Sequence, residues 1–392
     1  MSNVKVLIGN EAFDLQTHGG VTRCFCELMR RMPSNVETKV GVLTTENVYL
    51  QQMGIPSLDE RLAQMPFFTP SHKKTFYKIY KKGVGLRYHH PFSGTHTSPN
   101  AIYNCYLVGR QDYDVYHPTF FDQRFLRYIG NKPFVLTVHD MIVELFKDKY
   151  AAIDEKQLFD KAALIPRANH IIAVSECTKH DLMDIFHIPE ERITVIYHGS
   201  NEQPMTFCAS SPIDAPYLLY VGQRYENKQF NRFVEGASDF LHAHPEVKVV
   251  CTSVGFNKEE LALLDHLHLR DRFIHRFVAD DSELTNLYHH ALAFVYPSLY
   301  EGFGIPIFEA YQAACPVMLN HASCFPEIAG DAAIYFHLDG EHSDLAESLT
   351  QMYAMTTDER RALIDKQKSR LSRYSWQRSA EQLAEVYLRF RP

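Results

Sequence analysis

Short runs of β-branched and aromatic residues alternate with longer stretches of helical period along almost the whole chain. A strand that is followed by a helix and then by another strand crosses over its sheet, so the two strands run parallel. The pattern therefore predicts an α/β fold with parallel sheets and helices on both faces. We expect strands in two series, the first at 4–9, 38–43, 115–117, 134–139, 171–175 and 194–198, and the second at 217–222, 247–252, 273–277, 293–296 and 317–320.

The two series of strands predict two domains, over residues 1–200 and 217–373. A chain of 392 residues is long enough for both. Residues 201–216 contain three prolines and have no clear periodicity, so we expect a linker there. Within residues 374–392, apolar side chains recur at spacings of four and three, which predicts a final amphipathic helix that packs on one of the domains.

Composition excludes several classes of protein. The 40 basic and 47 acidic side chains give a net charge of −7, which is wrong for a general nucleic-acid binder because such proteins neutralise phosphates. Eight cysteines without a C-x-x-C pair do not indicate a disulfide framework. The motifs of nicotinamide, P-loop and zinc-protease sites are missing, so no metal or cofactor site is predicted. The first residues lack a signal-peptide pattern and no apolar run is long enough to span a bilayer. We therefore expect a cytoplasmic protein, attached at most peripherally to the inner face of the cell membrane.

One segment, residues 61–111, contains no Asp or Glu but eight Lys and Arg side chains. Aromatic residues are interleaved with the lysines. This combination suits an anionic membrane surface or a phosphate-bearing ligand. The alternative is a solvated basic insert in the first domain, and the sequence leaves both interpretations open.

The most informative stretch is VYPSLYEGFGIPIFEA, residues 295–310. It reads as the end of a strand, a turn and the start of a helix near Ile305. Gly302 and Gly304 in the turn let the backbone approach a ligand closely. The helix start offers unpaired N–H groups and a partial positive charge, so an anion such as a phosphate can bind there.

Glu301 and Glu309 lie on either side of the expected helix start. Two carboxylates at this spacing can bind hydroxyls at both ends of one extended ligand. Alternatively, both are ordinary first-turn residues that the helix dipole favours.

Other candidate side chains follow predicted strands. Arg224 and Lys228 come after the first strand of the second domain, where both can neutralise a diphosphate. His139 ends a strand of the first domain, at the edge where parallel sheets bind ligands. Gly20, in the pair Gly19–Gly20 after the first strand, can bring a backbone N–H to a phosphate or form a flexible turn.

These residues occur in a recognisable context. The run EGFGIPIFE resembles the E-x7-E signature of the retaining glycosyltransferases with a GT-B fold, in glycosyltransferase family 4. The resemblance continues through YLLYVGQRYENKQF, DSELTNLYHHALAFVYPS, PVMLN and FPEIAGDAAIYF, and it is weaker in the first half, where GGV, TVHD and VSE match. It implies two Rossmann-like domains that face each other across a cleft, with the acceptor in the first, the nucleotide sugar in the second, and the final helix crossing back to the first domain.

The resemblance also implies roles for the site residues. Glu301 would hold the transferred sugar, Glu309 the ribose, and His139 would be the active-site histidine of the first domain. Backbone and apolar contacts with the donor would come from Gly20, Gly302, Phe303, Gly304 and Ile305.

The same resemblance assigns Arg224 and Lys228 to the donor diphosphate, in place of a metal ion. Asn227 stands where the family often has an aromatic residue or Arg, so the geometry around Lys228 is less well defined by the pattern.

The implied reaction moves a hexose from a nucleoside diphosphate sugar to an acceptor hydroxyl and retains the anomeric configuration. The T-V-H-D and R-x-x-x-K forms look most like bacterial transferases that build O-antigen or capsule. They favour mannose from GDP-mannose, with a glycan or a lipid-diphosphate-linked saccharide as acceptor. A nucleotide-sugar 2-epimerase of the same fold and a non-catalytic nucleotide-sugar-binding scaffold subunit are the alternatives.

Overall fold

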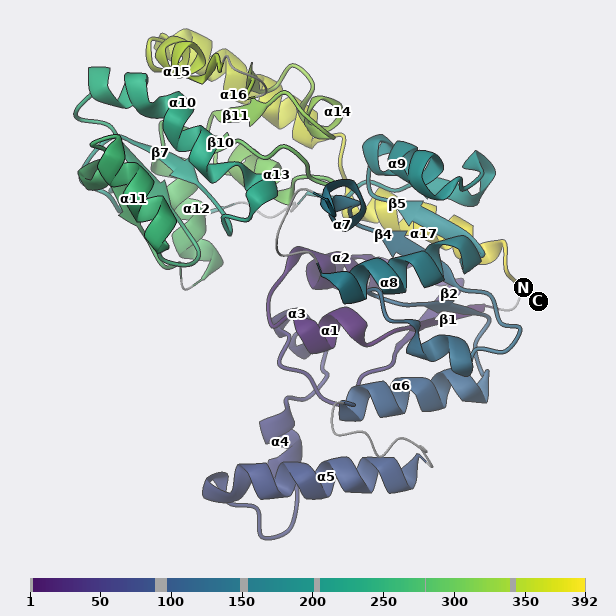
Figure 1. Ribbon diagram of the computed structural model, residues 1–392. Coiled ribbons are helices and arrows are strands. Elements are labelled where there is room, and N and C mark those ends of the chain that lie inside the picture. The colour runs from purple at the N-terminus through teal and green to yellow at the C-terminus, as the bar shows by residue number, and fades with distance from the viewer. Residues whose placement is uncertain are drawn as a thin grey trace. The chain divides into compact units, whose positions relative to one another are not determined.

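The computed structural model describes residues 3–88, 97–148, 154–200, 205–278, 280–338 and 343–391. Residues 201–204 of the expected linker and 89–96 of the expected basic insert therefore lie outside the described residues. The chain forms two compact units. The first unit comprises Met1–Val174, Thr178–Gly199 and Trp376–Pro392, and the second comprises Ser175–Cys177 and Ser200–Ser375. Each contains a parallel β-sheet with helices on both faces (Figure 1).

The sheet of the first unit has two three-stranded parts, in the orders β2-β1-β3 and β4-β5-β6. A single parallel bridge between Tyr116 and Phe134 joins them. All their strand pairs are parallel. The strands are β1 (Val4–Ile8), β2 (Val36–Val40), β3 (Val115–His117), β4 (Val135–Val138), β5 (His170–Ala173) and β6 (Ile193–Val195).

The sheet of the second unit has six parallel strands in the order β12-β11-β10-β7-β8-β9. They are β7 (Tyr217–Tyr220), β8 (Lys248–Cys251), β9 (Phe273–His275), β10 (Ala293–Tyr296), β11 (Val317–Asn320) and β12 (Ile334–Phe336). All eleven predicted strands are confirmed, with ends that differ by a few residues.

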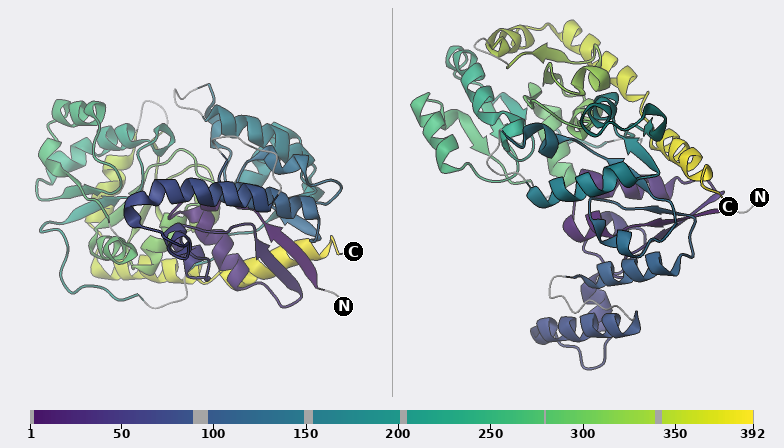
Figure 2. Two further views of the ribbon diagram at one scale, coloured as in Figure 1. Left: turned by 90° about the horizontal axis from the view of Figure 1, so that it is seen from below. Right: turned by 45° about the vertical axis from the view of Figure 1, so that its right-hand side comes forward.

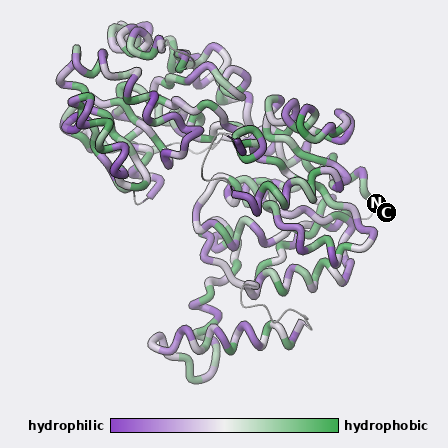
Figure 3. The backbone as a smooth tube through the Cα atoms, in the orientation of Figure 1, coloured by the Kyte–Doolittle hydropathy of each residue, from purple (hydrophilic) through white to green (hydrophobic). Residues whose placement is uncertain are grey.

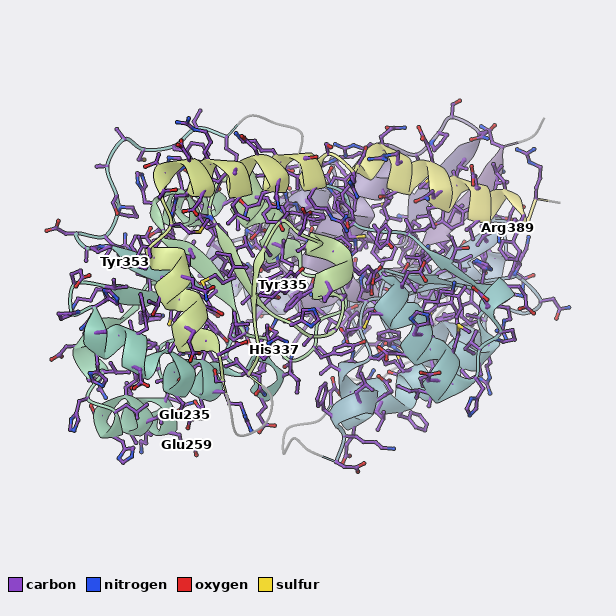
Figure 4. All side chains as sticks on the ribbon, turned by 90° about the horizontal axis from the view of Figure 1, so that it is seen from above. Glu235, Glu259, Tyr335, His337, Tyr353 and Arg389 are labelled. Carbon is purple, nitrogen blue, oxygen red and sulfur yellow. The ribbon has the colours of Figure 1, made fainter. Side chains whose placement is uncertain are left out.

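The sequence analysis missed β12, which has only three residues. It forms one edge of the sheet and pairs in parallel with β11. The hydroxyl of Tyr335 donates a hydrogen bond to the Gly330 carbonyl oxygen at 2.7 Å, and Tyr335 and His337 lie near the middle of the view in Figure 4. Tyr353 lies farther along the same unit and donates to the Glu246 carboxylate at 2.7 Å.

Helices connect successive strands in both units. The first half of the chain contains α1 (Glu11–Leu15), α2 (Gly20–Arg30), α3 (Val48–Gln51), α4 (Leu58–Ala63), α5 (Lys73–Arg87), α6 (Pro99–Arg110), α7 (Ile142–Phe146), α8 (Glu155–Leu164) and α9 (Glu176–Phe186). The second half contains α10 (Phe230–Ala243), α11 (Lys258–His266), α12 (Asp281–His290), α13 (Ile305–Gln312), α14 (Phe325–Ala329), α15 (Leu345–Tyr353), α16 (Thr357–Leu371) and α17 (Trp376–Leu388).

The final helix, α17, belongs to the first unit. Its apolar side chains, among them Trp376, Leu383 and Tyr387, share one buried cluster with Val6 of β1 and Phe25 of α2. The spacing of four and three in the sequence thus corresponds to one buried helix face. Apart from Ser175–Cys177, the second unit begins at residue 200 and ends at residue 375, and a parallel bridge pairs these two residues.

The basic helix α5 lies against α4 and α6, on the side of α6 away from the sheet (Figures 1 and 2). Hydrophilic and hydrophobic positions alternate along it (Figure 3). Val84 is its one fully buried residue, so most of the helix surface is in contact with solvent.

Candidate functional site

The connectivity of the second sheet defines where a ligand can bind. β7 and β10 are neighbours, and the chain continues from β7 to β8 and β9 on one side and from β10 to β11 and β12 on the other. In open α/β sheets, ligands bind outside the carboxyl ends of the strands at such a switch point. The loops after β7 and β10 carry most of the residues that the sequence singles out.

Two of these residues form an ion pair. The Lys228 ammonium group contacts the Glu301 carboxylate, and it donates a hydrogen bond to the Tyr296 hydroxyl at 3.3 Å. The exposed fractions of the Lys228 and Glu301 side chains are 20% and 12%, so both remain accessible to a ligand. Burial, and secondly the charge of Glu301, raise the pKa of Tyr296, so this tyrosine is a neutral hydrogen-bonding group beside the pair.

Hydrogen bonds connect the two loops to each other and to the loop after β11. The Asn227 side chain donates to the Tyr300 carbonyl oxygen at 3.2 Å, and the Leu299 N–H donates to the Asn227 carbonyl oxygen at 2.8 Å. The Ser323 hydroxyl donates to the carbonyl oxygen of Glu301 at 2.7 Å. Asn227 is buried and stands where the family pattern often has an aromatic residue or Arg. Its hydrogen bonds fix the backbone next to Lys228.

The helix after the second loop begins at Ile305, and this prediction is confirmed. Gly304 precedes it with φ +102°, and a Cβ there would lie 2.9 Å from the Ile307 side chain, so only glycine fits. Gly302 and Phe303 are buried under the same turn. The first turn of α13 contains no acidic residue, so the helix dipole does not account for either glutamate.

Glu309 is the fifth residue of α13 and lies well inside the helix. Its carboxylate accepts a hydrogen bond from the hydroxyl of Tyr288, in α12, at 3.4 Å. Burial raises the pKa of Tyr288 well above its usual value, and the nearby Glu309 carboxylate adds to the shift. Tyr288 and Tyr296 were missed from the sequence because nothing in the spacing distinguishes them from core tyrosines.

Arg224 and Lys228 have different surroundings. Arg224 Nε donates to the Glu260 carboxylate at 2.8 Å, and its Nη2 donates to the carbonyl oxygens of Val254 and Gly255 at 2.8 and 2.7 Å. The exposed fractions of the Arg224 and Glu260 side chains are 2% and 7%. The structure thus brings Lys228 to Glu301, whereas the Arg224 side chain is engaged inside the second unit.

In the first unit, His139 directly follows β4. Its ring stacks on His198 with centroids 6.0 Å apart, and the Phe25 ring lies edge-on at 6.3 Å. Burial lowers the pKa of His139 to about 4, so the imidazole is neutral near pH 7. Its Nε2 is shielded from solvent and has no hydrogen-bond partner among the described residues, which is unusual for a buried polar atom.

A further histidine, His117, lies behind this pair and was not singled out from the sequence. It is hydrogen-bonded to the Tyr387 hydroxyl at 2.6 Å and to the Thr137 hydroxyl at 2.9 Å. Burial lowers the pKa of His117 and of His198 to about 3 each, and the neighbouring His139 acts in the same direction.

Gly20 is the first residue of α2, the helix that carries Phe25. Gly19 before it has φ 169°, an extended conformation that any residue adopts, but a Cβ at Gly19 would lie 2.2 Å from the Gln16 side-chain oxygen. This oxygen is at the end of the flexible Gln16 side chain, which would have to move if residue 19 had a Cβ.

The first unit also contains a cavity of about 260 Å³, here called the polar cavity, beyond the carboxyl ends of β1 and β2. Residues 13–17, 44–46 and 98–100 line it, together with Tyr77 of α5. The Asp14 carboxylate at its edge accepts hydrogen bonds from the side chains of Asn10, Ser98 and Asn100. Hydroxyl, amide and carboxylate groups of this kind are suited to a polyol ligand.

Within the described ranges, no three His, Cys, Asp or Glu side chains are grouped so that they could hold a metal ion. The same residues include no helix that is both long and apolar enough to cross a bilayer.

Comparisons with known proteins agree with this architecture. The family described as "Glycosyltransferase Family 4" matches residues 18–203, and the family described as "Glycosyl transferases group 1" matches residues 209–370. Solved structures with the same fold include HepE of Anabaena in complex with UDP and glucose (TM-score 0.67, 17% identity, 98% and 99% of the two chains covered). Sucrose-phosphate synthase of Thermosynechococcus elongatus is another (TM-score 0.65, 17% identity, 99% of both chains covered).

Among curated relatives, the O-antigen chain mannosyltransferase RfbU of Salmonella typhimurium is 26% identical over 233 residues, which are 56% of this chain and 65% of the relative. The O-antigen chain mannosyltransferase B of Escherichia coli is 27% identical over 216 residues, 51% of this chain and 56% of the relative. The chain thus spans less than two thirds of the length of these relatives. The fold is GT-B. The chain belongs to the GT4-like glycosyltransferases of that fold.

Proposed function

We propose that the protein is a metal-independent retaining hexosyltransferase that uses a nucleoside diphosphate sugar and acts in the synthesis of bacterial surface polysaccharide. The observation that carries the proposal is the Lys228–Glu301 pair at the switch point of the second sheet, directly before the start of α13. It offers one cation for a diphosphate, one carboxylate for sugar hydroxyls, and a helix N-terminus in the same loop.

The chemistry follows from these groups. When the donor binds, Lys228 exchanges Glu301 for a diphosphate oxygen, and the freed carboxylate accepts hydrogen bonds from sugar hydroxyls. The bond between the anomeric carbon and the phosphate oxygen breaks, the bond to the acceptor oxygen forms on the same face, and the acceptor proton passes to the leaving phosphate. Lys228 stabilises the negative charge that develops on the diphosphate. Glu309 binds the ribose and holds the donor in position.

His139 supplies a neutral hydrogen-bonding group in the first unit. A buried polar atom without a hydrogen-bond partner costs free energy. We infer that a substrate hydroxyl is the missing partner of the His139 Nε2. A neutral imidazole can make this bond without the cost of burying a charge.

The favoured donor is GDP-mannose, since two curated relatives are named as O-antigen mannosyltransferases. A solved structure of the same fold holds UDP and glucose, so the nucleotide is a direct question for experiment. A thermal-shift measurement with GDP-mannose, UDP-glucose and ADP-glucose distinguishes the three, because a ligand that binds only the folded protein raises its melting temperature. We expect the largest shift with GDP-mannose, and no shift with any of the three would contradict the proposal.

Two substitutions test the assignment of the carboxylates. We expect Glu309→Ala to weaken donor binding, because it removes a contact with the ribose, which does not change during the reaction. Glu301→Ala should reduce turnover more than binding, because its sugar partner does change. Wild-type activity in both variants would show that the motif is misassigned. Donor turnover without any acceptor would indicate an epimerase instead.

The acceptor is proposed to be a glycan or a lipid-diphosphate-linked saccharide that enters the polar cavity, whose side chains can bind its hydroxyls. The adjacent helix α5 is proposed to contact an anionic membrane. Its exposed residues Lys74, Lys78 and Lys82 recur at intervals of four and share one helix face. Ile79 and Leu86 beside them are 51% and 68% exposed, the combination of charge and apolar surface typical of interfacial helices.

We limit the proposed membrane contact to the lysines of one helix face. Lys73 is paired with Asp59 at 2.6 Å, although its side chain is 48% exposed, and it is left out of the proposed face for that reason. Each Lys near an anionic surface contributes about 1 kcal/mol, so three of them support reversible attachment.

Sedimentation with vesicles that contain anionic lipid measures this attachment. We expect the wild type to bind, to lose binding at high salt as charges are screened, and to lose most of it in the variant Lys74/Lys78/Lys82→Gln. The matched control Lys258/Lys366/Lys368→Gln changes three exposed lysines of the second unit by the same total charge and should bind like the wild type. Equal binding of the two variants would rule out α5 as the membrane contact.

A further inference from the structure

A second cavity of the first unit, of about 370 Å³, shares no residue with the polar cavity. We call it the tyrosine cavity. It lies between α6 and residues within β1 and β2, such as Leu7 and Lys39, whereas the polar cavity lies beyond the ends of those strands. Its volume is within the range of roughly 300–1,000 Å³ typical of small-molecule sites. None of the groups assigned to donor binding or to the reaction lines it.

Four tyrosines line this cavity. The Tyr88 ring lies between those of Tyr103 and Tyr106, with centroids 5.0 and 4.9 Å apart and with tilts of 52° and 48°. Tyr113 completes the set and donates a hydrogen bond from its hydroxyl to the Val108 carbonyl oxygen at 3.3 Å. Burial raises the pKa of Tyr103, so its phenol is neutral. The cavity therefore presents flat apolar ring faces together with neutral hydroxyl groups.

Five charged residues line the cavity, the basic Lys5, Lys39 and Arg110 and the acidic Glu37 and Asp112, so the lining has a net charge of +1. Arg110 donates to the Asp112 carboxylate at 2.7 Å and to the Tyr106 hydroxyl at 3.3 Å, so its charge is compensated within the protein. Glu37 and Lys39 are exposed, lie two residues apart on the edge strand β2 and have opposite charges. The remaining charged residue, Lys5, is exposed, and one net positive charge does not make a strong anion site.

This combination matches the chemistry of a neutral saccharide. A pyranose has an apolar C–H face that can pack on an aromatic ring, and a rim of hydroxyls that can bond with carboxylate, ammonium and phenol groups. We propose that the tyrosine cavity is a carbohydrate-binding site that holds part of a glycan chain at a distance from the polar cavity.

The role of this site in catalysis rests on the proposed function. A saccharide acceptor long enough to reach both cavities would be tethered to the enzyme. Tethering raises the effective concentration of the reacting end. Binding at a remote site is the same in the ground state and the transition state, so it lowers KM for long acceptors and leaves kcat unchanged.

The first test measures binding alone, without donor, on the full chain. Mannopentaose and maltopentaose serve as probes in ligand-observed NMR, with inorganic phosphate as an anionic competitor. We expect one of the pentasaccharides to bind in the millimolar range and phosphate not to displace it. Tyr106→Ala should weaken binding about tenfold, and Tyr106→Phe, which keeps the ring, should weaken it much less.

Two controls keep the test decisive. Tyr128→Ala replaces a half-buried tyrosine of the same unit that lines neither cavity, and it should bind like the wild type. If Tyr106→Ala fails to fold, Lys39→Ala and Glu37→Ala on the exposed edge strand take its place, each with an expected loss of about threefold or more. No binding of either pentasaccharide, displacement by phosphate, or unchanged binding in all these variants would overturn the proposal.

The second test distinguishes failure of this proposal from failure of the proposed function. Glu301→Gln should abolish transfer while pentasaccharide binding persists, because the tyrosine cavity is not part of the donor site. With active enzyme, Tyr106→Ala should raise KM for a long saccharide acceptor and not for a monosaccharide acceptor. Equal changes in both KM values would refute the tether even if transfer itself is demonstrated.

Discussion

The candidate sites of the two units differ in the charge of their side chains. The first unit places His139, His198 and His117 at the carboxyl ends of its strands, and all three are neutral because burial lowers their pKa values. The second unit places the ion pair Lys228–Glu301 at the corresponding ends, where both side chains remain partly exposed. One site is built from neutral groups and the other from charges.

The difference fits the two substrates of the proposed reaction. A diphosphate is an anion whose charge rises as it leaves, so a preorganised cation is effective next to it. A saccharide hydroxyl is neutral, and a neutral imidazole can bond with it without desolvating a charge. The first unit should consequently be sensitive to pH, and the second to the loss of single charges.

The largest expected effect concerns the buried pair in the second unit. Arg224→Ala leaves the Glu260 carboxylate buried without its partner, so we expect the free energy of unfolding to fall by about 3–5 kcal/mol. Chemical denaturation followed by far-UV circular dichroism measures the loss. The double variant Arg224→Met/Glu260→Gln should recover most of it, because no unpaired charge remains. A loss below about 1 kcal/mol in Arg224→Ala would contradict the buried role of this pair.

Next in size is the effect of Lys228 on turnover. Lys228→Ala should cost about 2–4 kcal/mol of transition-state stabilisation, a loss of roughly 30- to 1,000-fold in kcat/KM. Lys228→Arg should retain part of the activity, since it keeps the charge. Steady-state kinetics should also show Arg224→Met/Glu260→Gln within about tenfold of the wild type if Lys228 alone meets the diphosphate. An equal loss in the two cases would restore the pairing of Arg224 and Lys228 that the sequence predicts.

The effect of pH on the free energy of unfolding of the first unit should be smaller. Two buried groups contribute to it with opposite signs. The unfolded chain binds protons at its histidines below about pH 6.5, whereas folded His198 binds one only near pH 3, so its contribution to the free energy of unfolding declines from pH 6.5 downward. Burial raises the pKa of Glu11 to about 7, so its contribution increases as the pH falls from 7 towards 4.5. Each change amounts to about 2 kcal/mol between pH 7 and pH 5.

Trp376 allows this to be measured in the first unit alone. It is the single tryptophan of the chain and is buried beside His198, with ring centroids 5.6 Å apart. In urea unfolding followed by its fluorescence, His198→Asn should make the protein less sensitive to acid, and Glu11→Gln should make it more sensitive. A change of the same sign in both variants would show that one of these assignments is wrong.

The smallest expected effect is that of divalent metal ions on activity, which we expect to be zero. In the proposed mechanism Lys228 provides the positive charge, so activity should be unchanged by EDTA and by added Mg²⁺ or Mn²⁺. The D-x-D sequence of the chain, Asp112 to Asp114, lies in the first unit, where Asp112 binds Arg110 and Asp114 accepts the Lys5 N–H at 2.8 Å. Loss of activity on chelation, with recovery on adding Mg²⁺, would break the comparison between the two units.

Local pattern was sufficient for most of the fold. Eleven of the twelve strands among the described residues were predicted from short runs of β-branched and aromatic residues, and the start of α13 is marked by Gly304, which the local geometry requires. What escaped prediction depends on distant residues. Glu260 lies 36 positions from Arg224, and the polar cavity combines loops that follow β1 and β2 with the start of α6. No local spacing reports such contacts, so the sequence predicts one role for Arg224 and Lys228, whose side chains have different partners in the structure.

The position of α17 has a consequence for how the protein is made. The core of the first unit is incomplete without Trp376, Leu383 and Tyr387, yet the ribosome produces them only after the whole of residues 200–375. At roughly 5–20 residues per second, the nascent first unit waits about 10–35 s with the β1 face of its sheet uncovered. The second unit has no such delay, because its strands and helices are contiguous in synthesis. The nascent first unit is therefore the part of the chain most dependent on chaperones, and a ribosome stall before residue 376 leaves it with an exposed apolar surface.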